Sequence, residues 1–332
     1  MSHPFIIQEK GNFNLSQYGK SVFLYPYARY AFLELLEKLD IETIYIPSFI
    51  CRDMLSPINS LNIQYMFYEI DNSLNPVLEN IKCDAILMVN YFGFEQNINP
   101  FSNYKKEFGA IIIEDNAHGL FSKDRKDNLL GTRGDVGLLS IRKTVFLPNG
   151  AVLVVNNKDF EKFDFRSAEM NRSEEDLRYQ KKVNLKKLFF TKYMGILFLL
   201  LRRYLRYIKT GSSIPLPDVN SETEMPSNRF ITPLLEDKVV LIDMNKETKR
   251  RQEMYLEIEE WAKKYSIEPI YFLDKNTVPF EFAFVDNGTA KEFENFLLQQ
   301  GYFILPWPDL PDEVVNSCPD FYKSIKVVPF LW

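Results

Sequence analysis

The apolar positions in the first half of the chain alternate between helical and strand-like spacing. After Ala28, the residues Ala31, Leu35, Leu36 and Leu39 recur at helical intervals. Short β-rich runs follow at 43–49 (TIYIPSF) and 63–70 (IQYMFYEI), and continuous apolar runs at 84–94 (DAILMVNYFGF) and 109–117 (GAIIIEDNA). Strands that are apolar throughout are typical of a parallel sheet covered on both faces. The pattern therefore predicts an α/β domain with helices on either side of a mostly parallel sheet.

Polar residues end two of these runs. Asn90 follows one apolar run and Asp115 ends the next, so both would lie at carboxyl ends of strands, where open α/β sheets bind ligands. The runs at 137–143 (GLLSIRK) and 150–156 (GAVLVVN) predict a further strand pair, joined through a turn at 148–150.

The second half of the chain changes in composition. No acidic residue occurs from 177 to 217, whereas ten lysines and arginines do, and a proline- and serine-rich stretch follows at 210–230. A helix is predicted over 235–265, a strand near 278–286 and a helix over 289–302. We therefore expect a large domain over 1–240, with a basic helical excursion at 177–217, and a small α+β domain over 241–332.

Composition narrows the class of protein. The chain has 332 residues and 46% hydrophobic residues, enough for a sizeable core. A net charge of −5 gives no basic field, so nucleic acid is not an expected partner. An odd count of three cysteines, and a beginning (MSHPFIIQEKGNF) without a secretory signal, indicate a cytoplasmic protein. With two histidines no metal site is expected, and no apolar run reaches the roughly 20 residues of a membrane span.

Three residues could together bind an aldehyde cofactor. Asp115, Ser140 and Lys143 supply a carboxylate, a hydroxyl and an amine. Pyridoxal phosphate (PLP) needs an amine for its aldehyde carbon, a carboxylate for its ring nitrogen and donors for its phosphate. Taken singly, each has a simpler explanation, because an aspartate at a strand end often caps a turn and a lysine often extends to solvent.

The order of these residues resembles that of fold type I PLP enzymes, and within them the DegT/StrS family of nucleotide-sugar aminotransferases. The segments IIEDNAHG, GTRGDVGLLSIRK and PNGAVLVVN resemble the family's acid-bearing strand, serine–lysine segment and following strand. Upstream, ARYAFLELL, IYIPSFICRDMLSPI and ILMVNYFGF resemble further family segments, and downstream so does ETKRRQEMYLEI. The likeness covers about residues 20–157 and, more faintly, 225 to the end.

The resemblance implies a three-layer α/β/α large domain, a smaller C-terminal domain, and a homodimer with its active site at the subunit interface. Lys143 would form the Schiff base with PLP and move the proton during catalysis, while Asp115 would pair with the ring nitrogen. Ser140 and the backbone amides of Ala28 and Arg29, at a helix start, would bind the phosphate. The implied reaction moves an amino group from an amino acid to a nucleotide-linked keto sugar, for surface polysaccharide.

Two positions depart from the family's pattern. His118 stands where the family usually has glutamine, so it would stack on the cofactor ring or bond its oxygen, unless it only packs against the sheet. Cys51 stands near the position of a stacking aromatic residue and would cover the ring less well, or serve as a small buried apolar residue. The side chain of Arg29 is open to a structural role. Because of these departures, a scaffold that has lost turnover stays an alternative, although Asp115, Ser140 and Lys143 argue against it.

Two further alternatives stay open. A sugar dehydratase of the same family would carry histidine in place of Lys143, which disfavours that reaction here. The basic stretch at 177–209 either forms a solvated helix with its apolar face buried on the domain, or lies on an anionic membrane, or grips a diphosphate-linked substrate.

Overall fold

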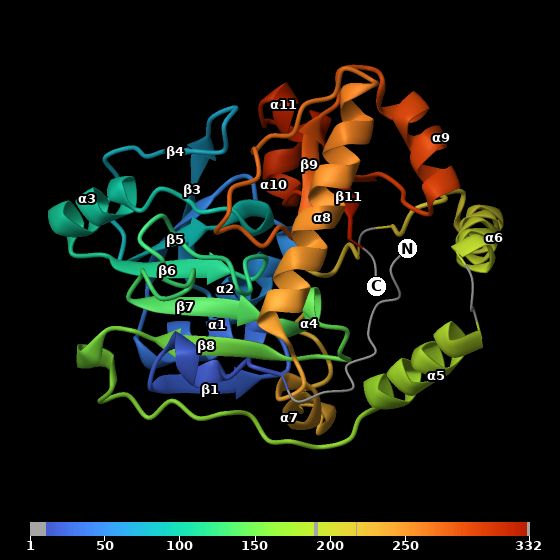
Figure 1. Ribbon diagram of the computed structural model, residues 1–332. Coiled ribbons are helices and arrows are strands. Elements are labelled where there is room, and N and C mark those ends of the chain that lie inside the picture. The colour runs from blue at the N-terminus through green and yellow to red at the C-terminus, as the bar shows by residue number, and fades with distance from the viewer. Residues whose placement is uncertain (1–10, 189–191, 217, 331–332) are drawn as a thin grey trace.

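The computed structural model describes residues 11–188, 192–216 and 218–330. Two sheets organise the chain, and Figure 1 shows the large sheet in the lower part of the molecule and the small one above it. The strands are β1 (Ser21–Tyr25), β2 (Thr43–Pro47), β3 (Gln64–Ile70), β4 (Pro76–Val77), β5 (Ala85–Val89), β6 (Ile111–Asn116), β7 (Val136–Ser140), β8 (Ala151–Val155), β9 (Glu281–Val285), β10 (Leu305–Pro306) and β11 (Ile325–Pro329).

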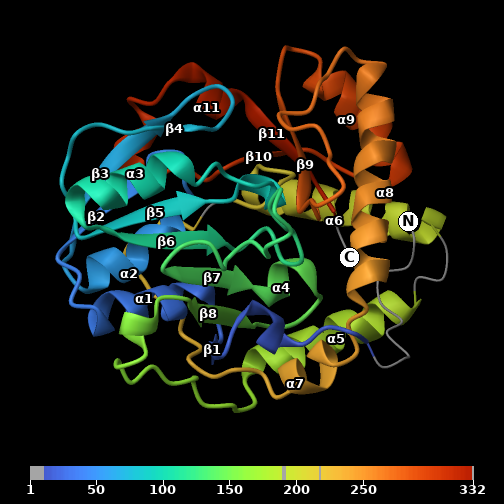
Figure 2. The same cartoon turned by 60° about the vertical axis from the view of Figure 1, so that its left-hand side comes forward.

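The helices cover the sheets and fill the links between strands. They are α1 (Ala28–Lys38), α2 (Leu55–Ser60), α3 (Asn99–Phe108), α4 (Ile141–Thr144), α5 (Glu174–Leu188), α6 (Lys192–Thr210), α7 (Leu234–Val239), α8 (Met244–Lys263), α9 (Ala290–Gln300), α10 (Asp312–Val315) and α11 (Asp320–Ser324). In Figures 1 and 2, α1 and α2 lie behind the large sheet, and the long helix α8 runs from its lower strands up to the small sheet.

The large sheet has eight strands in the order β1-β8-β7-β6-β5-β2-β3-β4. The pairs β3/β2, β2/β5, β5/β6 and β6/β7 are parallel, and the remaining pairs are antiparallel. Every residue of β5, β7 and β8 is buried, which explains their unbroken apolar character. The predicted mostly parallel α/β sheet is confirmed.

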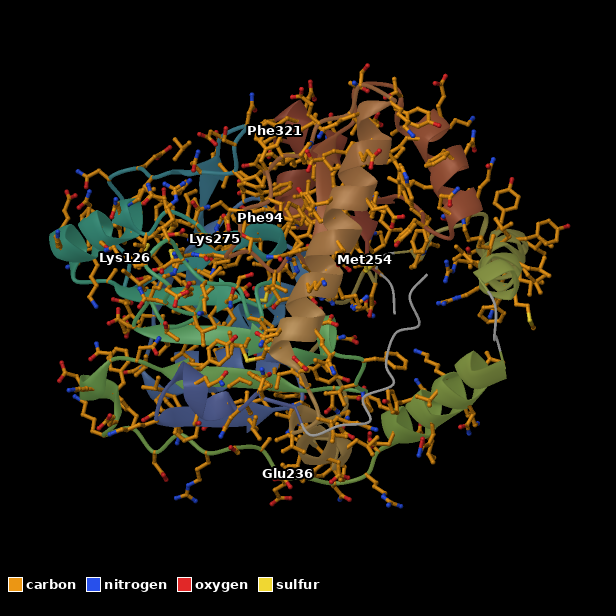
Figure 3. All side chains as sticks on the ribbon, viewed as in Figure 1. Phe94, Lys126, Glu236, Met254, Lys275 and Phe321 are labelled. Atoms are coloured by element: carbon orange, nitrogen blue, oxygen red, sulfur yellow. The ribbon has the colours of Figure 1, made fainter. Side chains whose placement is uncertain are left out.

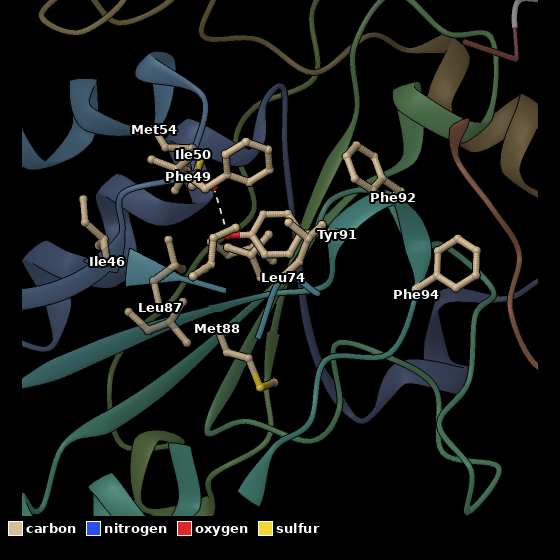
Figure 4. Close-up of a cluster of buried hydrophobic side chains, with 14 of the residues drawn as sticks. Ile46, Phe49, Ile50, Met54, Leu74, Leu87, Met88, Tyr91, Phe92 and Phe94 are labelled. Carbon is tan, nitrogen blue, oxygen red and sulfur yellow. Dashed lines mark hydrogen bonds between the residues drawn. The ribbon is translucent and has the colours of Figure 1, made fainter. Parts of the chain in front are cut away.

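The core extends from this sheet to the second one. Figure 4 shows part of the cluster, where the hydroxyl of Tyr91 donates to the carbonyl of Phe49 over 2.9 Å. Trp307, which follows β10, packs edge-on against Phe49 and Phe92 with ring centroids 5.2 and 4.7 Å apart. The three-stranded antiparallel sheet β10-β11-β9 is thereby joined to the strand ends of the large sheet. The boundary predicted at residue 240 stays a prediction.

Two predicted elements are interrupted in the structure. The single helix expected over 235–265 is wrong, because the chain breaks between α7 and α8. Residues 11–13 donate to the carbonyls of Val240 and Ile242 over 2.9 to 3.2 Å, and Asp243 caps α8 by accepting from the amide of Lys246. These carbonyls therefore cannot continue a helix. The strand expected over 137–143 also ends early, at Ser140, and Lys143 lies on the short helix α4.

The basic stretch at 177–217 forms α5 and α6, which Figure 1 shows at the edge of the molecule. Residues 189–191 and the lone residue 217 lie outside the described part of the chain, as does the segment 1–10. One explanation left open above, a helix whose apolar face is buried on the domain, is wrong for α6. Seven large apolar residues of α6, from Leu197 to Ile208, are at least 43% exposed. Within the described residues no helix is long and apolar enough to cross a membrane.

Candidate active site

Several sequence-predicted residues converge on one cleft at the carboxyl ends of β5, β6 and β7. The residues lining it include all seven that the sequence singles out: Ala28, Arg29, Cys51, Asp115, His118, Ser140 and Lys143. About 630 Å³ of non-atom space lies within the cleft, part of it open to solvent. Residues separated by more than a hundred positions in the sequence therefore border the same space.

Asp115 is fixed near the end of β6. Its carbonyl accepts from the amide of Asn90 and its Oδ1 accepts from the amide of Ala117, both over 2.9 Å. The side chain is buried, with 8% of its surface exposed. Burial raises the pKa of Asp115, while the positive charge of Lys143 and the amide of Ala117 act in the opposite direction. A buried carboxylate of this kind favours a cationic partner in the cleft.

Lys143 and His118 are neighbours. The Nζ of Lys143 lies 3.1 Å from the Nε2 of His118, within hydrogen-bond distance. Burial, and secondarily the charge of Lys143, holds the pKa of His118 well below its usual value. The imidazole is therefore neutral at neutral pH, and its Nε2 can accept a hydrogen bond from the lysine while Nδ1 carries the proton.

The ring of His118 is also held by aromatic neighbours. Phe280 stacks on it with centroids 4.5 Å apart and planes at 13°, and Trp307 meets it edge-on at 5.7 Å. Both residues come from the C-terminal part of the chain. His118 therefore packs against the protein on one side and borders the cleft on another. One face of its ring lies against Phe280, and the residue still lines the cleft.

A group of donors lies at the end of the cleft near α1. Tyr27 precedes this helix and makes no side-chain capping bond, so the amides of Ala28 and Arg29 are open to an anion. Ser140 is buried and lines the same cleft. The guanidinium of Arg142 lies 5.1 Å from the ring centre of Tyr27, and its buried Nε has no hydrogen-bond partner within the described residues.

Arg29 and Cys51 both line the cleft, but their side chains differ in what they bond to. The side chain of Arg29 is bonded within the protein, to Ser56 Oγ at 3.5 Å and the carbonyl of Glu224 at 3.4 Å, and lies 3.8 Å from Asp53 Oδ2, which favours a structural role for that side chain. Cys51 borders the cleft, and burial raises the pKa of its thiol to about 12. The thiol is therefore uncharged at neutral pH.

The loop between β6 and β7 is fixed by a buried ion pair. Arg133 donates from Nε and from one terminal nitrogen to Glu114 Oε1 over 2.8 and 2.7 Å, and both side chains are almost fully buried. The amides of Arg133 and Gly134 donate to the second oxygen of Glu114. This network holds β6 and β7 in register and thereby sets the separation of Asp115 and Ser140.

Sequence reasoning missed two buried charged residues near Lys143, Arg251 and Glu281. Arg251 on α8 is 1% exposed and donates to the carbonyl of Thr144 at 3.0 Å and to those of Pro279 and Phe280 at 3.2 and 3.3 Å. Glu281, which begins β9, is 7% exposed, and its Oε2 has no hydrogen-bond partner in the part of the chain described. Burial raises the pKa of Glu281 to about 7, although Lys143 and Arg251 both oppose the shift.

The sequence held weak signals for some of the missed residues. Arg142 stands between Ser140 and Lys143 within the motif itself, and Glu281 is an acid directly before the apolar run FAFV. Both break a local pattern, which is often a sign of function. Trp307 and Phe280 had no such signal, because their role depends on how the second sheet packs on the first.

The residues present fit PLP. The cleft combines one amine (Lys143), one buried carboxylate (Asp115) and a group of anion donors around Ser140 and the start of α1. The unpartnered Nε of Arg142 adds a further donor for a phosphate. These are the three requirements of the cofactor, and the residues that would meet them line one cleft.

Residues 55–186 match the model of the DegT/DnrJ/EryC1/StrS aminotransferase family. No curated protein matches the chain in sequence. The family model thus confirms the resemblance found in the sequence. At the level of the family, it also confirms the PLP-dependent transaminase class and the PLP cofactor. The roles of individual residues stay predictions.

Solved structures of low sequence identity share the fold. An aminotransferase from Helicobacter pylori, PseC, has a TM-score of 0.61 and 16% identity, covering 93% of this chain and 81% of its own. A DegT/DnrJ/EryC1/StrS aminotransferase from Brucella abortus has a TM-score of 0.57 and 14% identity, with 93% and 80% covered. An Escherichia coli GDP-4-keto-6-deoxy-D-mannose-3-dehydratase with bound hydrated PLP has a TM-score of 0.55 and 15% identity, with 93% and 83% covered. The fold type I architecture is confirmed.

Proposed function

We propose that this chain, whose residues 55–186 belong to the DegT/DnrJ/EryC1/StrS aminotransferase family, transfers an amino group from an amino acid to a nucleotide-linked keto sugar. The observation that supports this most is the common cleft of Lys143, Asp115 and Ser140. When bound, PLP supplies an aldehyde that carries the amino group and a protonated ring that withdraws electrons.

Lys143, His118 and Asp115 have different roles at the reacting end of the cofactor and at its ring nitrogen. Lys143 supplies the amine that holds the cofactor and then moves a proton at the reacting carbon. His118, neutral and 3.1 Å from that amine, accepts its hydrogen bond and orients it. Asp115 pairs with the protonated ring nitrogen, which supplies the cationic partner that its buried carboxylate lacks.

The phosphate is held at the other end of the cleft. Ser140 and the amides of Ala28 and Arg29 donate to it at the start of α1, where the helix dipole favours an anion. Arg142 adds charge from beside the lysine. Cys51, uncharged and half-buried, packs against the cofactor as an apolar group.

The substrate class and the setting are also proposals. Helicobacter pylori PseC is an aminotransferase involved in the biosynthesis of pseudoaminic acid, and the Escherichia coli relative acts on a GDP-linked keto sugar. These relatives support a nucleotide sugar as acceptor and surface polysaccharide as the product. We further propose a homodimer with its active site at the interface, a cytoplasmic location, and a division into domains 1–240 and 241–332.

The reaction can be tested with purified protein, PLP and a set of amino acids and nucleotide keto sugars. We expect a visible absorbance band that disappears on adding the donor amino acid and returns on adding the acceptor, with the aminated sugar seen by mass spectrometry. Lys143→Ala should abolish both changes, whereas Lys249→Ala, on the exposed side of α8, should leave them intact. A colourless protein that binds no PLP would overturn the proposal and favour the scaffold alternative.

Sugar dehydration is a second candidate, supported by the shared fold of the Escherichia coli dehydratase. Lys143 disfavours it, because the resemblance implies histidine at that position in such enzymes. The same incubation separates the two reactions. Dehydration consumes the keto sugar without forming an aminated product, and transamination requires one amino-acid donor for each sugar converted.

A further inference from the structure

Helix α6 attaches to the rest of the molecule through its arginines. Arg203 donates to Glu294 of α9 at 2.9 Å and lies 5.5 Å from the ring centre of Phe303, while Arg206 donates to the carbonyl of Ser213 at 3.1 Å. Both arginines are on the half-buried side of the helix. Figure 1 places α6 at the edge of the molecule, below the end of α9. Two of the charges on α6 therefore face inward, together with the half-buried Ile196 and Leu199.

The opposite side of α6 is apolar and exposed. Seven side chains make up this outer face, with exposed fractions from 43% to 68%: Leu197, Leu200, Leu201, Tyr204, Leu205, Tyr207 and Ile208. Their spacing of three and four residues puts them in one continuous arc along the helix, over a length of about 17 Å. Figure 3 shows the side chains of α6 directed into solvent at the edge of the molecule. A contiguous exposed patch of this size marks an interaction site.

The charges bordering the outer face are all positive. Arg202 and Lys209 are exposed and lie next to it on the helix, and α6 contains no acidic residue. The chain as a whole carries a charge of −5, so this positive charge is local and not a property of the entire surface. An apolar arc bordered by cations is the pattern of a helix that lies in the interface of an anionic membrane.

We propose that the outer face of α6 docks onto the surface of an anionic lipid bilayer, with the helix axis parallel to the membrane. Leu197, Leu201 and Ile208 would enter the boundary between headgroups and acyl chains, while Arg202 and Lys209 would contact lipid phosphates. This inference depends on the geometry of α6 and is independent of the cofactor site.

Charge favours lipid over a second copy of the chain as the occupant. A twofold contact of α6 with α6 would bring Arg202 and Lys209 of both copies together, with no carboxylate on either helix to neutralise them. An anionic lipid surface neutralises both charges of the helix at once. It also covers the whole apolar arc without requiring a matched protein surface.

The proposal is tested by co-sedimentation of the full-length, PLP-loaded protein with lipid vesicles. We expect binding to vesicles of phosphatidylcholine mixed with phosphatidylglycerol, and at least about tenfold weaker binding to phosphatidylcholine alone or in high salt. The double substitution of Leu197→Glu and Ile208→Glu should weaken binding to the anionic vesicles by at least about tenfold. A matched control is Val219→Glu with Phe272→Glu, which places the same charges at equally exposed apolar positions elsewhere.

A second pair of substitutions tests the electrostatic contribution. Arg202→Gln with Lys209→Gln should weaken binding and reduce its dependence on salt. Each variant is checked for folding by its urea unfolding midpoint. The proposal would be overturned if the protein bound no vesicles, or if it sedimented equally with neutral and anionic vesicles. It would also be overturned if the double substitution in α6 and the control double substitution bound anionic vesicles equally. A change from dimer to monomer in the α6 double, measured by sedimentation velocity, would overturn it too, because the outer face would then be an interface between copies.

Discussion

The buried carboxyl of Glu281 makes the stability of the protein depend on pH in a predictable direction. Its pKa is raised by burial from 4.5 to about 7, so between these pH values the folded chain keeps a proton that the unfolded chain has lost. The free energy of unfolding must fall as pH rises through this window. At about 1.4 kcal/mol per pH unit, the full effect is about 3 kcal/mol. It is absent below pH 4.5 and complete above pH 7.

The perturbation that isolates this effect is Glu281→Gln, because glutamine keeps the shape but does not titrate. We expect the free energy of unfolding of the variant, relative to that of the wild type, to rise by about 3 kcal/mol between pH 4.5 and pH 8. Urea unfolding of the PLP-free protein, followed by tryptophan fluorescence at several pH values, measures the difference directly. Comparing the two proteins across pH cancels the contributions of other groups, such as His118 and Asp115.

A control substitution removes an exposed acid of the same kind. Glu292→Gln on α9 should change the free energy of unfolding by less than about 0.5 kcal/mol at every pH, because Glu292 is exposed. If the curves for wild type and Glu281→Gln stay parallel from pH 4.5 to pH 8, the carboxyl does not titrate in this window. The interpretation of Glu281 as a buried, uncompensated acid would then be refuted.

Three more predictions concern the cleft. Arg251→Met should lower the free energy of unfolding by about 3 kcal/mol or more, measured in urea, because it leaves the carbonyls of Thr144, Pro279 and Phe280 without this donor and Glu247 with Arg250 alone; an unchanged midpoint would contradict this. Arg142→Ala should weaken the binding of PLP at least about tenfold but leave that of pyridoxal, which lacks the phosphate, nearly unchanged in fluorescence titrations; equal losses would show that Arg142 does not contact the phosphate. Cys51, with a thiol pKa raised to about 12, should react with a thiol reagent at pH 8 at least about tenfold more slowly than in the urea-unfolded chain, and equal rates would show an exposed thiolate.

The parts of the fold that depend on local pattern could be predicted from the sequence. Continuous apolar runs predicted the buried strands β5 and β6, and helical spacing after Ala28 predicted α1. The break between α7 and α8 could not be predicted, because the carbonyls of Val240 and Ile242 are bonded by residues 11–13, more than two hundred positions away. A helix pattern alone does not show such a competing partner.

The candidate site also has a part that could be predicted from the sequence and a part that could not. Asp115 and Ser140 stand at strand ends that a parallel sheet brings to one edge, and Lys143 follows Ser140 by three residues on α4, so their convergence follows from sequence order and topology. The contacts of Phe280 and Trp307 with His118 depend on how the second sheet packs on the first. The inward position of Arg203 on α6 depends on its pairing with Glu294, and spacing could not indicate which side of the helix would face inward.

The most direct test of the account concerns the amine that binds the cofactor. Purified protein is incubated with PLP, reduced with borohydride and digested, and the peptide carrying the pyridoxyl group is identified by mass spectrometry. The account predicts modification of Lys143, with Asp115→Asn still labelled there but inactive in transamination. Modification mainly at another lysine, or none at all, would contradict it.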